Sequence, residues 1–189
     1  MPRPPRPQIP DGIYHVTNRG NRRQPIFLDS HDRAHLLRML EALARARGWI
    51  GLGYCLMPNH YHLVLQTPSG DLSSGMQWLN GRYAQDFNHR HGFDGHLFQG
   101  RFYSGVVEGD GHLLELSRYL AWNPVEVGLC RTPQQWLWGS YRAVAGLAKS
   151  PVPRFLEVRR VLELFSPRRE SAVDRFRAFV NDVPGDRQT

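Results

Sequence analysis

The sequence has few cysteines, almost no lysine and no long apolar run, and each shortage excludes a class of protein. Its two cysteines, Cys55 and Cys130, stand in neither a metal-binding nor a disulfide-like spacing, which argues against a disulfide scaffold and a cysteine-ligated zinc site. No stretch approaches the roughly 20 apolar residues of a membrane span. The first residues, MPRPPRPQIPDG, lack the apolar core of a signal peptide. We therefore expect a cytoplasmic protein with no membrane partner.

Acidic side chains are also fewer than basic ones. The chain of 189 residues has 24 Lys and Arg against 17 Asp and Glu, which gives a net charge of +7 and a pI of about 10.0. Lys149 is the only lysine, so arginine carries nearly all of the positive charge. Such a balance predicts an anionic partner, and nucleic acid is the first candidate because arginine binds phosphate and stacks on bases.

The composition divides the chain into three segments. Residues 1–11 are rich in Pro and Arg and predict a flexible arm. Residues 12–149 predict one domain, and residues 150–189 predict a helical C-terminal extension of one or two arginine-rich helices and a polar tail.

Apolar spacing within the domain predicts alternating strands and helices. GIYHVTNRG at 12–20 alternates as a strand does, and a helix is expected from a cap at Ser30 to a stop at Gly48. Two strands should meet at a Pro58-Asn59 turn, before a second helix, a short strand and a third helix capped by Asp110. This βαββαβ order predicts an α+β fold: a ferredoxin-like antiparallel sheet with helices on one face, followed by C-terminal helices.

Two histidines stand at the start of the strand HYHLVLQT. Because alternate strand residues share a face, His60 and His62 point the same way and Tyr61 points to the opposite layer. Neutral imidazole is a common ligand of divalent metals, so the pair is either a half-exposed polar surface or part of a metal site. Two histidines alone leave coordination positions open, as in a catalytic site rather than a structural one.

The third helix has a polar stripe made of His112, Glu115, Tyr119 and Asn123. A phenol such as that of Tyr119, with a pKa near ~10, can attack a phosphorus atom that a metal has polarised. The same stripe is also typical of a solvated helix face. Asn123 before Pro124 is equally a signal for the N-terminus of a new helix.

Four segments resemble one known family in order and spacing: IYHVTNRGNRRQPIF, CLMPNHYHLVL, LFQGRFYS and YLAWNPVEVGL. They are similar to the single-tyrosine HUH transposases (IS200-like), in particular the REP-associated tyrosine transposases, over about residues 10–145. Two positions depart from the family pattern: Tyr61 stands where an apolar residue is usual, and Glu126 where a basic residue is common.

The resemblance implies a metal-dependent single-stranded DNA endonuclease and strand transferase. Tyr119 falls on the family nucleophile, and His60, His62 and Asn123 fall on the ligands of Mg²⁺ or Mn²⁺. The implied intermediate is a 5′-phosphotyrosine, and the implied partner is single-stranded or hairpin DNA with REP-like palindromes, which places the protein at the nucleoid. A monomer and a homodimer both stay open.

Arginines interleaved with aromatic residues predict the DNA-binding surface, because a single-strand groove needs cations for phosphate and rings for bases. The alternative to an enzyme is a catalytically idle, domesticated protein that recognises the same repeats. A metal phosphohydrolase of small nucleotides is disfavoured by the lack of further acidic ligands. The expected DNA-binding residues are Arg19, Arg22, Arg23, Phe98, Arg101 and Phe102.

Overall fold

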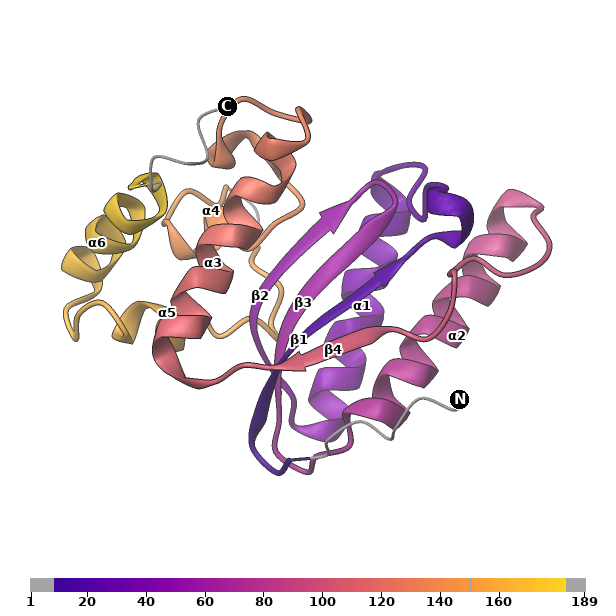
Figure 1. Ribbon diagram of the computed structural model, residues 1–189, viewed down its shortest axis with the longest axis horizontal. Coiled ribbons are helices and arrows are strands. Elements are labelled where there is room, and N and C mark those ends of the chain that lie inside the picture. Colours follow the sequence, from indigo (N-terminus) through magenta and orange to yellow (C-terminus); the bar gives the residue numbers. More distant parts are fainter. Residues whose placement is uncertain (1–8, 150, 183–189) are drawn as a thin grey trace.

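The computed structural model describes residues 9–149 and 151–182, and it has the predicted βαββαβ order followed by further helices (Figure 1). Most of the expected Pro/Arg arm, residues 1–8, lies outside the described residues, as do residue 150 and residues 183–189 of the expected C-terminal extension. The elements are β1 Gly12–Arg19, η1 Asn21–Arg23, α1 Ser30–Arg47, β2 Ile50–Met57, β3 His60–Thr67, α2 Leu72–His91, β4 Tyr103–Val106, α3 Gly109–Glu126, η2 Pro133–Gln135, α4 Tyr141–Val144, α5 Val158–Glu163 and α6 Arg169–Asn181.

The four strands form one antiparallel sheet in the order β2-β3-β1-β4, which confirms the ferredoxin-like α+β fold. β1 and β3 are central, and their register pairs Arg19 with His60 and Thr17 with His62. Buried and partly buried residues alternate along β1 as the sequence predicts. Tyr14 and Val16 are buried, whereas Ile13 and His15 on the opposite face are only partly buried.

Helices α1 and α2 cover one face of the sheet (Figure 1). Their apolar positions pack against Tyr14, Tyr61 and Leu63 in a core that we call the helix-side core. Asp32 of α1 lies in the same layer with only 3% of its surface exposed. It forms ion pairs with Arg90 and with His91, which lies 3.1 Å away, and so ties the start of α1 to the end of α2.

Helix α3 covers the other face and is itself backed by α4, α5 and α6, so a second core lies there (Figure 1). The apolar stripe of α3, made of Leu113, Leu116 and Leu120, is buried in it. Two side chains of α3 also hold the end of α6: Arg118 Nε donates to the carbonyl of Phe179 at 3.1 Å, and Trp122 Nε1 donates to that of Val180 at 2.7 Å. The C-terminal extension, expected to have one or two helices, has two, α5 and α6, and the second of them is joined to α3.

Two helix starts differ from the prediction. Asp29, not Ser30, caps α1, because its side chain accepts a hydrogen bond from the backbone N–H of Asp32 at 3.0 Å. α3 begins at Gly109, so Asp110 lies in the first turn rather than at the cap, where its charge still suits the helix dipole.

Helix α3 also continues through Pro124 to Glu126 instead of ending at Asn123. A proline within a helix removes one backbone donor, which is tolerated here because the helix is about to end. The end is a Schellman motif in which Gly128, at φ 74°, donates to Val125 and Leu129 donates to Pro124. Asn123 therefore stays in helical register, one turn beyond Tyr119.

No helix within residues 9–149 and 151–182 is long and apolar enough to cross a membrane.

Candidate functional site

The His-x-His pair lies on the face of β3 that α3 covers. The ring centroids of His60 and His62 are 4.9 Å apart and the rings are nearly perpendicular. Tyr61 between them points into the helix-side core, where its ring is fully buried. The predicted split of this tripeptide between the two faces is confirmed.

Hydrogen bonding leaves one ring nitrogen of His60 available to a ligand. Its Nδ1 lies 2.7 Å from Oδ1 of the Asn59 side chain, an atom that only accepts, so Nδ1 carries the proton and Nε2 has the lone pair. The Asn59 amide is itself oriented by donating to the Arg23 carbonyl at 3.0 Å. Burial, aided by the nearby charge of Arg19, lowers the His60 pKa to about 4, so the imidazole is neutral at neutral pH.

His62 is held by a residue that the sequence did not single out for the site. Its Nδ1 lies 3.0 Å from Nε2 of His15 on β1, and the two rings stack at 5.2 Å. Burial and the neighbouring His60 and His15 lower the His62 pKa to about 3. The opposite nitrogen, Nε2, is buried and has no hydrogen-bond partner within the described part of the chain.

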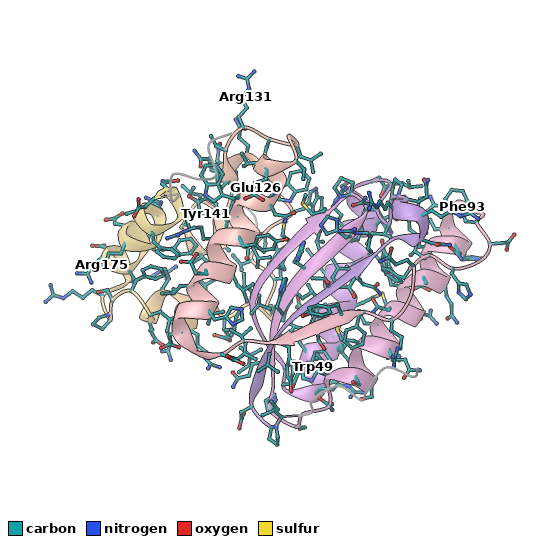
Figure 2. All side chains as sticks on the ribbon, viewed as in Figure 1. Trp49, Phe93, Glu126, Arg131, Tyr141 and Arg175 are labelled. Atoms are coloured by element: carbon teal, nitrogen blue, oxygen red, sulfur yellow. The ribbon has the colours of Figure 1, made fainter. Side chains whose placement is uncertain are left out.

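Tyr119 reaches the histidines from α3. Its ring lies edge-on to His62 with a centroid distance of 5.3 Å, and 6.2 Å from His15. Burial and the charge of Glu126 raise the Tyr119 pKa above 10.0, while the Asn123 amide interacts with the phenol and opposes the rise. Figure 2 shows Glu126 at the C-terminal end of α3, near the ends of β2 and β3. The phenol is therefore protonated at neutral pH.

Asn123 presents the second buried atom that lacks a partner. The residue is 7% exposed, and its Oδ1 makes no hydrogen bond to any described residue. An unsatisfied buried acceptor costs free energy, so such atoms usually meet a ligand, an ion or water. Among the described residues, no group of three or more His, Cys, Asp or Glu could hold a metal ion. The donor set of two imidazoles and one amide fits a divalent cation.

The rest of the polar stripe on α3 does not join this group. His112 accepts a hydrogen bond from the backbone of Glu108 at 3.1 Å, and Glu115 pairs with Arg118 at 3.4 Å. Both His112 and Glu115 are exposed. Only the second half of the stripe belongs to the site.

Three of the four arginines expected to bind DNA lie on or just after the end of β1, near His60. Arg19 is its register partner on β1, and Arg22 and Arg23 form the exposed turn η1 that follows. Both turn residues have positive φ angles, 53° and 60°, a strained conformation that is often found at functional sites. The turn is attached to the Pro58-Asn59 turn, because Gly20 donates to the Asn59 carbonyl at 2.8 Å.

The three candidates in the glycine-rich loop differ in exposure. Arg101 is exposed and Phe102 is only 5% exposed. Phe98 is half-buried, and its ring centroid lies 6.2 Å from that of Tyr61. The structure therefore leaves Arg101 facing solvent and part of Phe98 accessible, while Phe102 has little free surface for stacking. Their contact with DNA stays a prediction.

A ferredoxin-like sheet with a His-x-His strand and a tyrosine on the facing helix defines the class of tyrosine transposases. The chain belongs to the IS200-like transposase family, whose model matches residues 8–123 and so ends at Asn123. A search of curated proteins returned no match. Among solved structures, the chain is similar to a REP-associated tyrosine transposase bound to a REP hairpin, at 20% identity and a TM-score of 0.65, over 81% of this chain and 90% of that one.

Proposed function

We propose that the protein is a divalent-metal-dependent endonuclease and strand transferase that acts on single-stranded DNA at hairpin-forming repeats. One observation carries the proposal: His62 Nε2 on the sheet and Asn123 Oδ1 on α3 are both buried without a partner in the described part of the chain, and both residues contact Tyr119. Two unsatisfied buried atoms next to a nucleophile suit a cation and the phosphate that it would bind.

His60, His62 and Asn123 would hold Mg²⁺ or Mn²⁺, which when bound neutralises negative charge on the scissile phosphate. The two histidines suit this role because their lowered pKa values keep them neutral, and neutral imidazole is the form that binds metal. His15 holds the ring of His62 in place and so acts as a positioning residue.

Tyr119 would carry out the covalent step. Its Oη forms a bond to phosphorus while the bond from phosphorus to the 3′-oxygen breaks. The phenol gives up its proton and the leaving 3′-oxygen takes one up, so no water is consumed. The product is a 5′-phosphotyrosine and a free 3′-OH, and attack by another 3′-OH reverses the step and joins strands without ATP.

Three features support a hairpin with single-stranded flanks as the substrate. The net charge of +7 attracts phosphate, the arginine turn Arg19–Arg23 lies next to His60, and a similar fold has been solved on a REP hairpin. A single strand lies more easily than a duplex across a site whose tyrosine is half-buried on α3.

The test uses hairpins with unpaired flanks taken from the repeats next to the protein's own gene. With Mg²⁺ or Mn²⁺ we expect a protein–DNA adduct that survives a denaturing gel, and with EDTA we expect none. Equal cleavage in EDTA, or preference for a fully paired duplex, would contradict the proposal. Binding without any adduct would favour the idle DNA-binding alternative.

A further inference from the structure

A cavity of about 760 Å³ lies on the opposite face of the sheet from Tyr119, between α2 and the loop that leads to β4. One stripe of α2 forms its wall, with Ser73, Gln77, Asn80 and Ala84 at helical spacing and Gly81 beside them. Small residues keep the wall open, and a β-carbon added at Gly81 would meet no atom within 4 Å. The volume is within the roughly 300–1,000 Å³ that is usual for small-molecule sites.

The lining chemistry is that of neutral amides around an aromatic ring. Asn18, Asn21, Gln77, Asn80 and Gln99 all line the cavity, together with part of the Phe98 ring. Among the described residues that line it there is no Asp, Glu or Lys, and its one arginine, Arg101, is exposed. Amide groups that both donate and accept, next to a ring, match the edge and the face of a nucleobase.

Tyr61, the unusual middle residue of the His-x-His motif, fixes the orientation of one of these amides. Its hydroxyl donates to Asn80 Oδ1 at 2.6 Å, so the Asn80 NH₂ group is the part left for a ligand. Phenylalanine or an aliphatic residue at this position would fill the same core without orienting the amide. The hydroxyl of Tyr61 thus has a purpose at the cavity, on the face away from its histidine neighbours.

The cavity lies at the same end of the central strands as the metal-ligand histidines. Asn21 N–H donates to the Leu97 carbonyl at 2.8 Å and Gln99 N–H donates to that of Arg19 at 3.0 Å, so the loop is joined to the end of β1. Arg19 is in turn the register partner of His60. A DNA strand that leaves Tyr119 across the arginine turn can therefore turn around the β1 end and reach the cavity.

From these observations we infer that the cavity binds one unpaired nucleobase of the DNA flank and reads it through the Asn80 and Gln77 amides. This inference rests on the proposed function for its ligand, single-stranded DNA. The arginine turn binds phosphate regardless of sequence. The cavity then supplies the base specificity that selects where the strand is cut.

The experiment fills the cavity without disturbing the core. Gly81→Leu places a side chain into open space on α2, and leucine favours a helix more than glycine does. Gly111→Leu is the matched control, because Gly111 is an exposed glycine of α3 whose added β-carbon also meets no atom. The full-length protein is incubated in EDTA with a DNA hairpin that carries a randomised unpaired flank, and the bound pool is sequenced.

We expect wild type and Gly111→Leu to select a particular base at one flank position, and to bind about tenfold more weakly when that position is abasic. Gly81→Leu should bind the intact and abasic flanks equally. Absence of base selection in wild type, or unchanged selection in Gly81→Leu, would overturn the inference.

A second variant decides the matter if Gly81→Leu does not fold. Asn80→Asp keeps the acceptor for Tyr61 but turns the group that faces the cavity from a donor into an acceptor. It should change which base is preferred, whereas a merely structural role would weaken binding to all flanks alike; the latter result counts against the cavity. Adduct formation with Mg²⁺ is measured separately. Base selection without an adduct would contradict the proposed enzymatic function and leave the base-binding cavity supported. An adduct without base selection would contradict only the base-binding cavity.

Discussion

The two faces of the sheet use the same strands for opposite purposes. On the helix side, Tyr61, Leu63 and their neighbours form a core closed by two long helices, and its buried charge, Asp32, is paired. On the α3 side, His62 Nε2 and Asn123 Oδ1 are buried and have no hydrogen-bond partner among the described residues. The strand period of two makes this division possible, because each step along β3 changes the face.

The difference shows where the fold accepts an energetic cost. Unsatisfied buried groups destabilise a protein, and they are retained where a ligand completes them. Other buried atoms without a described partner occur away from the site, such as Arg33 Nε on α1 and Thr67 Oγ1 on β3, but only at the site do two of them lie beside Tyr119 among the described residues. Substitutions on the α3 side should therefore affect chemistry more than folding, and those on the helix side the reverse.

The largest effect is expected from Tyr119→Phe. The ring and its packing against His62 remain, but the attacking oxygen is gone, so the adduct on a denaturing gel should disappear entirely while hairpin affinity changes little. Tyr103→Phe is the matched control, since Tyr103 is a 64% exposed tyrosine on β4 and should still allow the adduct. An adduct that persists in Tyr119→Phe and vanishes in Tyr103→Phe would show that the nucleophile has been misassigned.

His62→Ala should remove metal-dependent cleavage and leave DNA affinity within a few fold, because affinity comes mainly from phosphate contacts. It removes an unsatisfied buried group but also loses the hydrogen bond and stacking with His15 and leaves a cavity, so we expect only a small change of its melting temperature without metal. Cleavage and thermal melting measured side by side check both statements, with exposed His89→Ala as the control. A variant that melts much earlier would mean that His62 belongs to the stabilising core.

His15→Ala should have an intermediate effect. The ring of His62 loses the contact at 3.0 Å that orients it, and loss of such a support typically costs about 10–100-fold in metal affinity. The Mn²⁺ concentration for half-maximal cleavage should rise accordingly, while cleavage at saturating Mn²⁺ recovers. His15→Gln, which can restore a hydrogen bond to Nδ1, should recover part of the affinity, and equal behaviour of the two variants would deny His15 this role.

The smallest effect on cleavage is expected from Asp32→Asn on the helix side. Burial alone would raise the Asp32 pKa, but hydrogen bonds from the Leu28 backbone, His91 and Arg90 lower it below 3.8 overall. The carboxylate therefore stabilises the fold above about pH 3.8, and this contribution is lost as the pH falls through the lower folded pKa. Asp32→Asn should lower the free energy of unfolding by about 1–2 kcal/mol at neutral pH. The free energy of unfolding should also fall less steeply at acidic pH than in wild type, and adduct formation should be normal.

Much of the fold could be predicted from the sequence because local signals agree with the final packing. The alternation in GIYHVTNRG and the spacing of Leu72, Met76 and Leu79 each identify both the element and its buried side. The helix ends were less certain. Ser30 and Asp110 were one or two residues from the actual caps, since neighbouring polar residues compete for the same role.

Candidate site residues could be predicted where they share one strand or one helix, or where the resemblance to a known family assigned them a role. His60 and His62 share a strand, and Tyr119 and Asn123 share a helix, so spacing placed each pair. His15 was missed because its contact with His62 depends on the register of β1 against β3, which a sequence does not state. A search for histidines that strand alternation places on the same face of the sheet would have found it.

The attachment of α3 to α6 has a consequence for the order of events during synthesis. Arg118 and Trp122 depend on carbonyls that lie 61 and 58 positions later in the chain. At about 5–20 residues per second on the ribosome, those carbonyls are made roughly 3 to 12 seconds after α3 itself. The sheet and its arginine turn can thus be complete while the helix that bears Tyr119 still lacks its contacts with α6, so the proposed DNA binding would precede the proposed cleavage.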